Sequence, residues 1–428
     1  MMSSEAGRYR NRIVDDELDV LLRGLAAISL EGPKGVGKTS TAEHRGGSIF
    51  RLDDPEVLQL VKAQPEVFVT AERPVVIDEW QQFPPSWDVV RRAVDDDATP
   101  GRFLLTGSAT PASRPMHSGA GRIVPLRIRP LTLAERGVGE PTVSFASLVS
   151  GSRPLLSGET DVDLDGYTTE ILRGGFPGMR SSVERVQRAA LEGYLERIVD
   201  RDLPENGLSV RQPNRLRRWL QAYAAATAST ASFEKIARAS TPGEEHTPAR
   251  STTSAYREAL ERMWILDPVN AWSPTHNHLA RLSQSPKHFL ADPALAAQLV
   301  GVTAEDLLRG EGPRRSVNDG PFLGALFESL VALHLHVFAQ HTEAKVSHFR
   351  TWSGDREVDF IVNRGIQRTV AIEVKLTASV DEQDVAQLVW LRKKLGESLT
   401  DAIVITTGKY AYRRPDGIGV VPLALLGP

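Results

Sequence analysis

Nine residues near the N-terminus, GPKGVGKTS from Gly32 to Ser40, set the architecture expected for the first third of the chain. They match the pattern G-x-x-x-x-G-K-[ST], with Gly32, Gly37, Lys38 and Thr39 at the required places. The apolar run AAISL precedes the match, and a segment with helical character follows it. A strand, a glycine-rich loop and a helix in this order predict a P-loop, whose main-chain amides surround a phosphate group.

A P-loop of this kind predicts ATP and Mg²⁺ as ligands. Lys38 is expected to reach the β- and γ-phosphate oxygens, and the hydroxyl of Thr39 is expected to bind Mg²⁺. The residues expected to contact the nucleotide are Gly32, Pro33, Lys34, Gly35, Val36, Gly37, Lys38, Thr39 and Ser40.

The second half of such a site is an apolar strand that ends in an acid, and PVVIDEW supplies it about 40 residues after the loop. We expect Asp78 to hold Mg²⁺ through water and Glu79 to polarise the attacking water, which predicts hydrolysis. The following strand, RFLLTGSAT, ends in Thr106 and Ser108, either of which is a candidate to contact the γ-phosphate. The alternative for these two residues is an ordinary turn at the end of a strand.

Hydrolysis of ATP often requires an arginine that neutralises charge in the transition state, and another subunit can supply it. Arg122, Arg173 and Arg201 are candidates for this role. The sequence does not choose among them, and each is also compatible with a structural place on the surface.

The whole chain has the length and composition of a multidomain globular protein. Its 428 residues exceed the size at which a single hydrophobic core usually stops growing, so we expect two or three domains. It contains no cysteine, which excludes disulfides, thiolate metal sites and cysteine nucleophiles. The net charge of −3 neither requires nor excludes a nucleic-acid partner. We expect a cytoplasmic protein without a membrane segment, because no run approaches about 18 consecutive apolar residues.

Segments rich in glycine, proline and charge divide the chain near residues 150–166 and 308–321. Before the first segment, short apolar runs alternate with helical segments, which is typical of an α/β fold with a parallel sheet. The middle is mostly helical, and a long helix near 321–339 precedes three strand-like runs in the last third. We therefore predict an α/β P-loop ATPase domain at 1–150, a helical region at 165–308 and a second α/β domain at 315–428.

The order of the motifs resembles a family of bacterial and archaeal AAA+ type ATPases over nearly the whole chain. The motifs are GPKGVGKT, VVIDEWQ with Gln81, LLTGS, a GR before PLTLAE, RGGFP and YLERIVDRDL. The resemblance implies ATP binding and hydrolysis, a winged-helix region after the P-loop domain, and a C-terminal domain of unknown function related to restriction endonucleases. Lys34 departs from the family, which usually has arginine there; the charge is kept, but the planar fork is lost.

The middle region shows three helical segments followed by a short apolar run from Trp264 to Trp272, which resembles a winged helix with the run as its hairpin. Arg250 and Arg257 lie beside the third helical segment and would meet phosphates if that helix entered a DNA groove. The alternative is that this region only packs on the ATPase domain and transmits its state.

The runs EVDFIV and TVAIEVKL are separated by a connector short enough for an antiparallel hairpin. Because side chains alternate along a strand, Glu373 and Lys375 should point the same way. The same rule places Asp359 on the face opposite to Val358 and Phe360. The hairpin is then expected to bring Asp359 beside Glu373.

These residues predict a D…ExK site of the restriction-endonuclease type, PD-(D/E)xK. Asp359 and Glu373 would bind Mg²⁺, and Lys375 would orient the attacking water or stabilise the phosphorane oxygens. The resemblance adds Glu328, in the preceding helix, as a further metal-site acid, and Gln387 as a polar residue near the site. The alternative is an exposed, charged strand face.

The leading hypothesis is an ATPase whose nucleotide state controls DNA engagement or Mg²⁺-dependent cleavage by the C-terminal domain. The runner-up is an ATP-controlled switch or interaction protein, in which a non-cleaving nuclease-like domain binds a protein partner. A polymer-threading motor is a third hypothesis and would require a homo-oligomeric ring.

Overall fold

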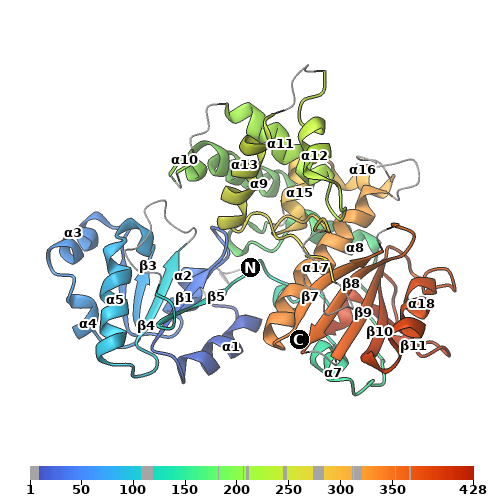
Figure 1. The fold of residues 1–428 in the computed structure, drawn as a ribbon, viewed down its shortest axis with the longest axis horizontal. Coiled ribbons are helices and arrows are strands. Elements are labelled where there is room, and N and C mark those ends of the chain that lie inside the picture. The colour runs from blue at the N-terminus through green and yellow to red at the C-terminus, as the bar shows by residue number, and fades with distance from the viewer. Residues whose placement is uncertain are drawn as a thin grey trace, which may run out of the picture.

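The computed structural model describes residues 9–107, 119–181, 183–205, 207–208, 212–243, 248–272, 284–310, 312, 321–351, 353–365 and 368–428. Figure 1 shows three regions, with the N-terminal sheet in blue, the mainly helical middle region in green and yellow, and the C-terminal sheet in orange and red. The predicted α/β class therefore holds for the N-terminal domain, and the last region also combines a sheet with helices.

The N-terminal sheet has five parallel strands in the order β2-β3-β4-β1-β5. The predicted strands AAISL, PVVIDE and RFLLTGS are confirmed as β1, β3 and β4. The strands are β1 (Ala27–Glu31), β2 (Ser48–Arg51), β3 (Val75–Asp78), β4 (Phe103–Gly107) and β5 (Ile123–Arg127). The helices are α1 (Ile13–Leu22), α2 (Lys38–Glu43), α3 (Pro55–Ala63), α4 (Val67–Thr70) and α5 (Pro85–Asp96).

Both faces of this sheet are buried, as the continuous apolar runs predict. Along β3, Val75 and Ile77 pack in one core, while Val76 packs in the core of the opposite face together with Leu30 of β1. In a parallel sheet covered on both faces, ligands bind outside the carboxyl ends of the strands. The P-loop, Asp78 and Thr106 all lie at that end.

The middle region consists of helices joined by short segments, one of which is a π-helical turn at Ile198–Asp202. The helices are α8 (Leu164–Arg173), α9 (Glu184–Arg197), α10 (Leu203–Glu205), α11 (Pro213–Ala225), α12 (Phe233–Ala239), α13 (Arg250–Arg262), α15 (Pro293–Val300) and α16 (Ala304–Leu308).

The apolar run expected to form a hairpin wing is packed inside the protein instead of projecting from it. It pairs with a later segment through two antiparallel bridges, Leu266 with Leu290 and Val269 with Lys287. Its end then joins the C-terminal sheet, since Trp272 N donates to His348 O at 2.6 Å. Residues 273–283 lie outside the described residues. A winged helix remains a prediction for this region.

The C-terminal sheet has six strands in the order β11-β12-β10-β9-β8-β7. The predicted antiparallel pairing of β8 with β9 is confirmed, and β10 runs parallel to β9. Its strands are β7 (Lys345–Arg350), β8 (Glu357–Arg364), β9 (Arg368–Lys375), β10 (Leu399–Thr406), β11 (Tyr412–Arg413) and β12 (Gly419–Pro422). Helix α17 (Phe322–His341) covers one face of the sheet, and α18 (Ala386–Leu395) covers the other.

The alternation expected along β8 is broken by a bulge. Phe360 packs toward α17, whereas Val358 and Ile361 both pack toward α18. The register with β7 shifts between the partners of Ile361 and Val358, so β8 has one extra residue there. The prediction that Asp359 lies opposite to Phe360 was wrong, because the ammonium of Lys287 contacts both side chains.

Helix α17 is the one helix in the described part of the chain that is long and apolar enough to cross a membrane. However, 78% of its apolar window is buried inside the protein. It packs against β7 and β9 and, at its far end, against α1 of the N-terminal domain. Packing in the core therefore accounts for its hydrophobicity.

A short segment after the N-terminal sheet packs on the C-terminal sheet. Strand β6 (Val143–Ser144) pairs in parallel with β13 (Leu426–Gly427), and α7 (Phe145–Ser150) contacts β8, β9 and β10. Helix α6 (Leu133–Arg136) precedes this segment. The division of the chain at 1–150, 165–308 and 315–428 remains a prediction.

Candidate functional sites

The P-loop connects β1 to α2, and its backbone requires glycine. Gly32 has a φ of 153°, and a Cβ there would lie 2.2 Å from the carbonyl oxygen of Ile128. Gly37 has a φ of 102°. Lys38 Nζ donates to the carbonyl oxygens of Gly32 at 2.8 Å and Pro33 at 2.9 Å, and burial lowers its pKa to about 8. The main chain of the loop therefore holds the ammonium of its own lysine.

Thr39, Asp78 and Thr106 meet at the carboxyl ends of β3 and β4. Thr39 Oγ1 donates to Asp78 Oδ1 at 2.7 Å, and Thr106 Oγ1 donates to the same oxygen. The hydroxyl and carboxylate that should hold Mg²⁺ are thus already adjacent, and the oxygen donors fit this ion. Thr106 contacts Asp78, which makes it a positioning residue; its expected contact with the γ-phosphate stays a prediction. Ser108 lies outside the described residues.

Glu79 occupies a constrained position directly after β3. Its φ of 54° is unusual for a residue with a side chain, and its N–H donates to Thr106 Oγ1 at 3.3 Å. The carboxylate accepts a hydrogen bond from Gln81 Nε2. Burial raises the pKa of Glu79, and Lys38 opposes this shift. A carboxylate with a raised pKa, held beside the phosphate loop, is suited to accept a proton from water.

The three arginines proposed from the sequence are engaged in ion pairs with acids outside the P-loop. Arg122 lies 2.7 Å from Asp95 and Arg201 lies 2.8 Å from Glu205. Arg173 lies 3.7 Å from Glu170. The structure therefore gives none of them a contact with the predicted nucleotide site within this chain.

Two other arginines lie beside the P-loop, and the sequence interpretation missed them. Arg12 Nη1 donates to Val36 O at 3.0 Å, and Arg12 is buried. Arg12 and Arg180 line a cavity of about 370 Å³ together with Gly37 and Ser40. The available signal for Arg12 was its place at the start of the region of family resemblance. Arg180 lies three positions after the last residue of the RGGFP motif.

Lys34, expected to contact nucleotide, contacts the middle region in this structure. Its Nζ lies 2.6 Å from Asp202 Oδ1, in the π-helical turn. Tyr194 of α9 donates to the carbonyl oxygen of Lys34 at 3.2 Å. The P-loop therefore touches the middle region through both a side chain and the main chain.

A second junction joins all three regions at the end of β5. Asp267 accepts from Arg127 at 3.0 Å and from Arg129 at 2.9 Å. Arg129 also donates to Gln340 of α17 at 3.1 Å, and Gln340 donates to Glu17 of α1 at 2.9 Å. Burial alone would raise the pKa of Asp267, but the two arginines hold it well below its usual value.

The residues of the predicted D…ExK site do come together. Glu328, Asp359, Glu373 and Lys375 line one cavity of about 930 Å³, which α11 and α12 border on the other side; Gln387 lines it too. Glu373 Oε1 lies 2.9 Å from Lys375 Nζ, so these side chains point the same way, as expected. Asp359 Oδ2 accepts from Val374 N at 2.9 Å. The predicted proximity is confirmed, whereas the metal role remains a prediction.

Lys287, from the middle region, lies at the centre of this acidic group, and no sequence motif marks it. Lys287 Nζ lies 2.6 Å from Glu328 Oε1, 2.9 Å from Asp359 Oδ1 and 3.3 Å from Glu357 Oε1. Burial would raise the pKa of Asp359, but Lys287 holds it below its usual value. Burial raises the pKa of Glu328 to about 8.

This arrangement does not fit a divalent ion. Two of the three predicted ligands, Glu328 and Asp359, already share an ammonium, which would stand in the place of a metal ion between them. Glu373 is not paired with Lys287; its Oε2 is buried without a hydrogen-bond partner among the residues that the structure describes.

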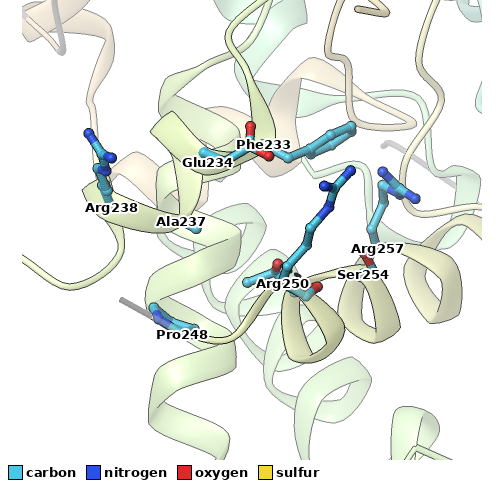
Figure 2. Close-up of a pocket in the computed structure, with 9 residues that line it drawn as sticks. Phe233, Glu234, Ala237, Arg238, Pro248, Arg250, Ser254 and Arg257 are labelled. Carbon is cyan, nitrogen blue, oxygen red and sulfur yellow. Dashed lines mark hydrogen bonds between the residues drawn. The ribbon is translucent and has the colours of Figure 1, made fainter. Parts of the chain in front are cut away.

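Arginines also line a cavity of about 290 Å³ between α12 and α13. Figure 2 shows Arg250 and Arg257 projecting from α13 toward Phe233, while Arg238 lies toward the other end of α12. The guanidinium of Arg257 lies 4.5 Å from the centre of the Phe233 ring. Glu234 is the acidic residue among those lining the cavity. The cavity therefore has a net positive lining, which suits an anionic group.

Three family models match successive parts of the chain. A family model described as an AAA domain matches residues 26–136. Two models described as domains of unknown function, DUF8612 and DUF4143, match residues 164–306 and 323–426.

The chain is also similar to whole proteins. Uncharacterized protein Rv2008c of Mycobacterium tuberculosis and Uncharacterized protein Mb2031c of Mycobacterium bovis are each 25% identical to it over 405 residues, which is 92% of this chain and 79% of theirs. The solved Walker-type ATPase PABY2304 of Pyrococcus abyssi has 16% identity and a TM-score of 0.39, covering 67% of this chain and 94% of that one. The AAA-domain match and the geometry of the loop make the N-terminal domain of this chain a P-loop ATPase-type domain.

Proposed function

We propose that the chain hydrolyses ATP and that its nucleotide state controls how the middle and C-terminal regions engage DNA. The observation that carries this proposal is the 2.6 Å contact between Lys34 of the P-loop and Asp202 of the middle region. The ammonium of Lys34, which a phosphate would attract, is bound to Asp202 of the middle region. The same region carries the arginine-lined cavity between α12 and α13. Binding of ATP would therefore compete with a contact between the two regions.

Hydrolysis is assigned to residues already aligned at the ends of β3 and β4. Lys38 leaves the carbonyl oxygens of Gly32 and Pro33 to bind the β- and γ-phosphates. Glu79 orients a water molecule and accepts its proton, while Thr106 keeps Asp78 and the main chain of Glu79 in place. Mg²⁺, held by Thr39 and Asp78, would neutralise phosphate charge during the reaction.

DNA is proposed as the partner because of the cavity between α12 and α13. Arg250 and Arg257 line it two turns apart on α13, and Arg238 of α12 also lines it. Arginines placed on helices in this way bind phosphate oxygens through paired N–H donors. Phe233 adds an aromatic surface that contacts Arg257.

We propose that the C-terminal domain binds DNA without cleaving it. It would then be a non-cleaving nuclease-like domain, as in the runner-up hypothesis, but with DNA as its partner. Magnesium-dependent cleavage would need Asp359 and Glu373 as ligands, and Asp359 is ion-paired with Lys287. The proposal also includes a nuclease-like fold for this domain, a cytoplasmic location and assembly into a homo-oligomer.

The test is ATP turnover measured with duplex, single-stranded and branched DNA, for the wild type and Lys38→Ala. We expect DNA to stimulate turnover by the wild type and Lys38→Ala to abolish turnover under every condition. Turnover that no DNA changes, together with absent DNA binding, would reject the DNA partner and favour a switch that acts on a protein. Turnover that survives in Lys38→Ala would reject the assigned ATPase site.

A further inference from the structure

The buried lysine in the acidic group of the C-terminal domain has the geometry of a bound cation. An ammonium has three N–H donors and no acceptor. Lys287 meets three carboxylates, with Nζ at 2.6 Å from Glu328, 2.9 Å from Asp359 and 3.3 Å from Glu357. Its side chain is only 2% exposed. Nζ donates a hydrogen bond to Asp359 Oδ1, and the oxygens of Glu328 and Glu357 lie within ion-pair distance of it. The burial of Lys287 keeps water away from most of the ammonium.

The carboxylates come from two elements of the C-terminal domain, and the lysine comes from a third segment. Glu328 projects from α17, whereas Glu357 and Asp359 lie on β8. The bulge in β8 turns Asp359 to the same side as Phe360, toward Lys287. The ammonium thus bridges a helix and a strand, as a metal ion does when it is shared between acids on two elements.

The main chain around Lys287 fixes the position of the ammonium. Lys287 N donates to Val269 O at 2.8 Å, and Val269 N donates to Lys287 O at 2.9 Å. The next residue is held from another side, since His288 N donates to Ser229 O at 2.9 Å and Ala228 N donates to His288 O at 2.8 Å. Withdrawing Lys287 would break these bonds, so it is built into the fold.

We propose that the ammonium of Lys287 is the resident cation of the acidic site formed by Glu328, Glu357 and Asp359. The site consequently takes no divalent ion between Glu328 and Asp359, and the middle region supplies the charge that completes the C-terminal domain. Without the lysine, the largely buried carboxylate of Asp359 would lose this cationic partner, which is costly in a protein interior. The inference requires neither ATP hydrolysis nor DNA binding, so it can fail or hold independently of the proposed function.

The test replaces the lysine and counts Mn²⁺ by electron paramagnetic resonance in the absence of nucleotide. Lys287→Met keeps most of the side-chain volume and removes the charge. We expect it to bind one more Mn²⁺ per chain than the wild type and to lose that ion when Asp359→Asn is added. Its unfolding temperature should be lower than that of the wild type in EDTA and should rise when Mn²⁺ is supplied.

Lys235→Met is the matched control, because Lys235 lines the same cavity from α12. It should bind as many Mn²⁺ ions as the wild type.

A second comparison does not depend on the folding of Lys287→Met. The wild type and Asp359→Asn should bind the same number of Mn²⁺ ions, because Lys287 already occupies the site. Loss of an ion in Asp359→Asn relative to the wild type would overturn the proposal. A folded Lys287→Met that gains no Mn²⁺ and no stabilisation by Mn²⁺ would overturn it as well.

Discussion

The ammonium of Lys34 lies 2.6 Å from the carboxylate of Asp202, although the two residues are 168 positions apart in the chain. Lys34 is 45% exposed in its side chain, whereas that of Asp202 is only 5% exposed. A lysine in the P-loop is therefore drawn toward the middle region by a fixed, nearly buried anion. This contact makes the phosphate loop and the middle region sensitive to each other.

Replacing Asp202 should change nucleotide affinity. In Asp202→Asn the attraction is lost, and Lys34 becomes available to phosphate. A partly exposed ion pair is worth about 1 kcal/mol, which corresponds to about fivefold tighter binding of ATP. Titration with a fluorescent ATP analogue measures this. Glu205→Gln, at a nearby but exposed pair with Arg201, should leave the affinity unchanged; equal affinities for all three proteins would refute the coupling.

Thr106 should affect turnover more than binding. Its hydroxyl donates to Asp78 and accepts from the N–H of Glu79, so it aligns both acids without occupying the loop. Thr106→Val keeps the shape and removes these bonds, and we expect kcat to fall by about tenfold or more with a smaller change in KM. Steady-state ATPase assays measure both constants. The same substitution at the exposed Thr70 of α4 should have no effect; a fall confined to KM would contradict a positioning role.

The junction at Asp267 should contribute to stability in a pH-dependent way. Its pKa is held well below the value of about 3.9 expected in the unfolded chain. The stabilisation is therefore present above about pH 4 and is lost as the pH falls below it toward the folded pKa.

Asp267→Asn removes this contribution and leaves Arg127 and Arg129 buried without their anion. We expect the free energy of unfolding at pH 7 to fall by about 3 kcal/mol, as is usual when one partner of a buried pair is removed. Urea unfolding at pH 7 and at pH 3 measures the effect, and the difference between variant and wild type should shrink at pH 3. Asp200→Asn, at an exposed pair with Arg217, should cost less than about 1 kcal/mol at either pH.

The P-loop half of the site was predictable because its chemistry is local in the sequence. Gly32 and Gly37 satisfy backbone requirements within one loop, and Asp78 ends a strand whose apolar run is unmistakable. The role of Thr106 was not predictable in the same way, since it depends on β4 lying between β1 and β3. Strand order is set by long-range packing, which a single sequence does not reveal.

The C-terminal site was predictable only in part, for two physical reasons. Strand alternation correctly predicted that Glu373 and Lys375 point the same way. It also predicted that Asp359 and Phe360 lie on opposite faces of the sheet, which failed because β8 contains a bulge. An extra residue in a strand leaves no clear trace in an apolar pattern. Lys287 was missed because it lies 41 positions before Glu328 in a segment without a motif, and only the fold brings them together.

Arg250 should contribute to DNA binding mainly through charge. It lines the cavity between α12 and α13 near the start of α13, where Figure 2 shows its guanidinium directed toward Phe233. A single phosphate contact changes the slope of log K against log salt by about one, because one counterion fewer is released when the contact is lost. Fluorescence anisotropy with a labelled duplex, measured over a range of salt concentrations, should therefore give Arg250→Ala a slope smaller by about one and a weaker affinity at low salt.

Arg262→Ala is the matched control, because it removes the same charge at the exposed far end of α13; it should keep the wild-type slope. Equal slopes for the wild type and Arg250→Ala would place the DNA contact elsewhere, because net charge alone affects Arg250→Ala and Arg262→Ala alike.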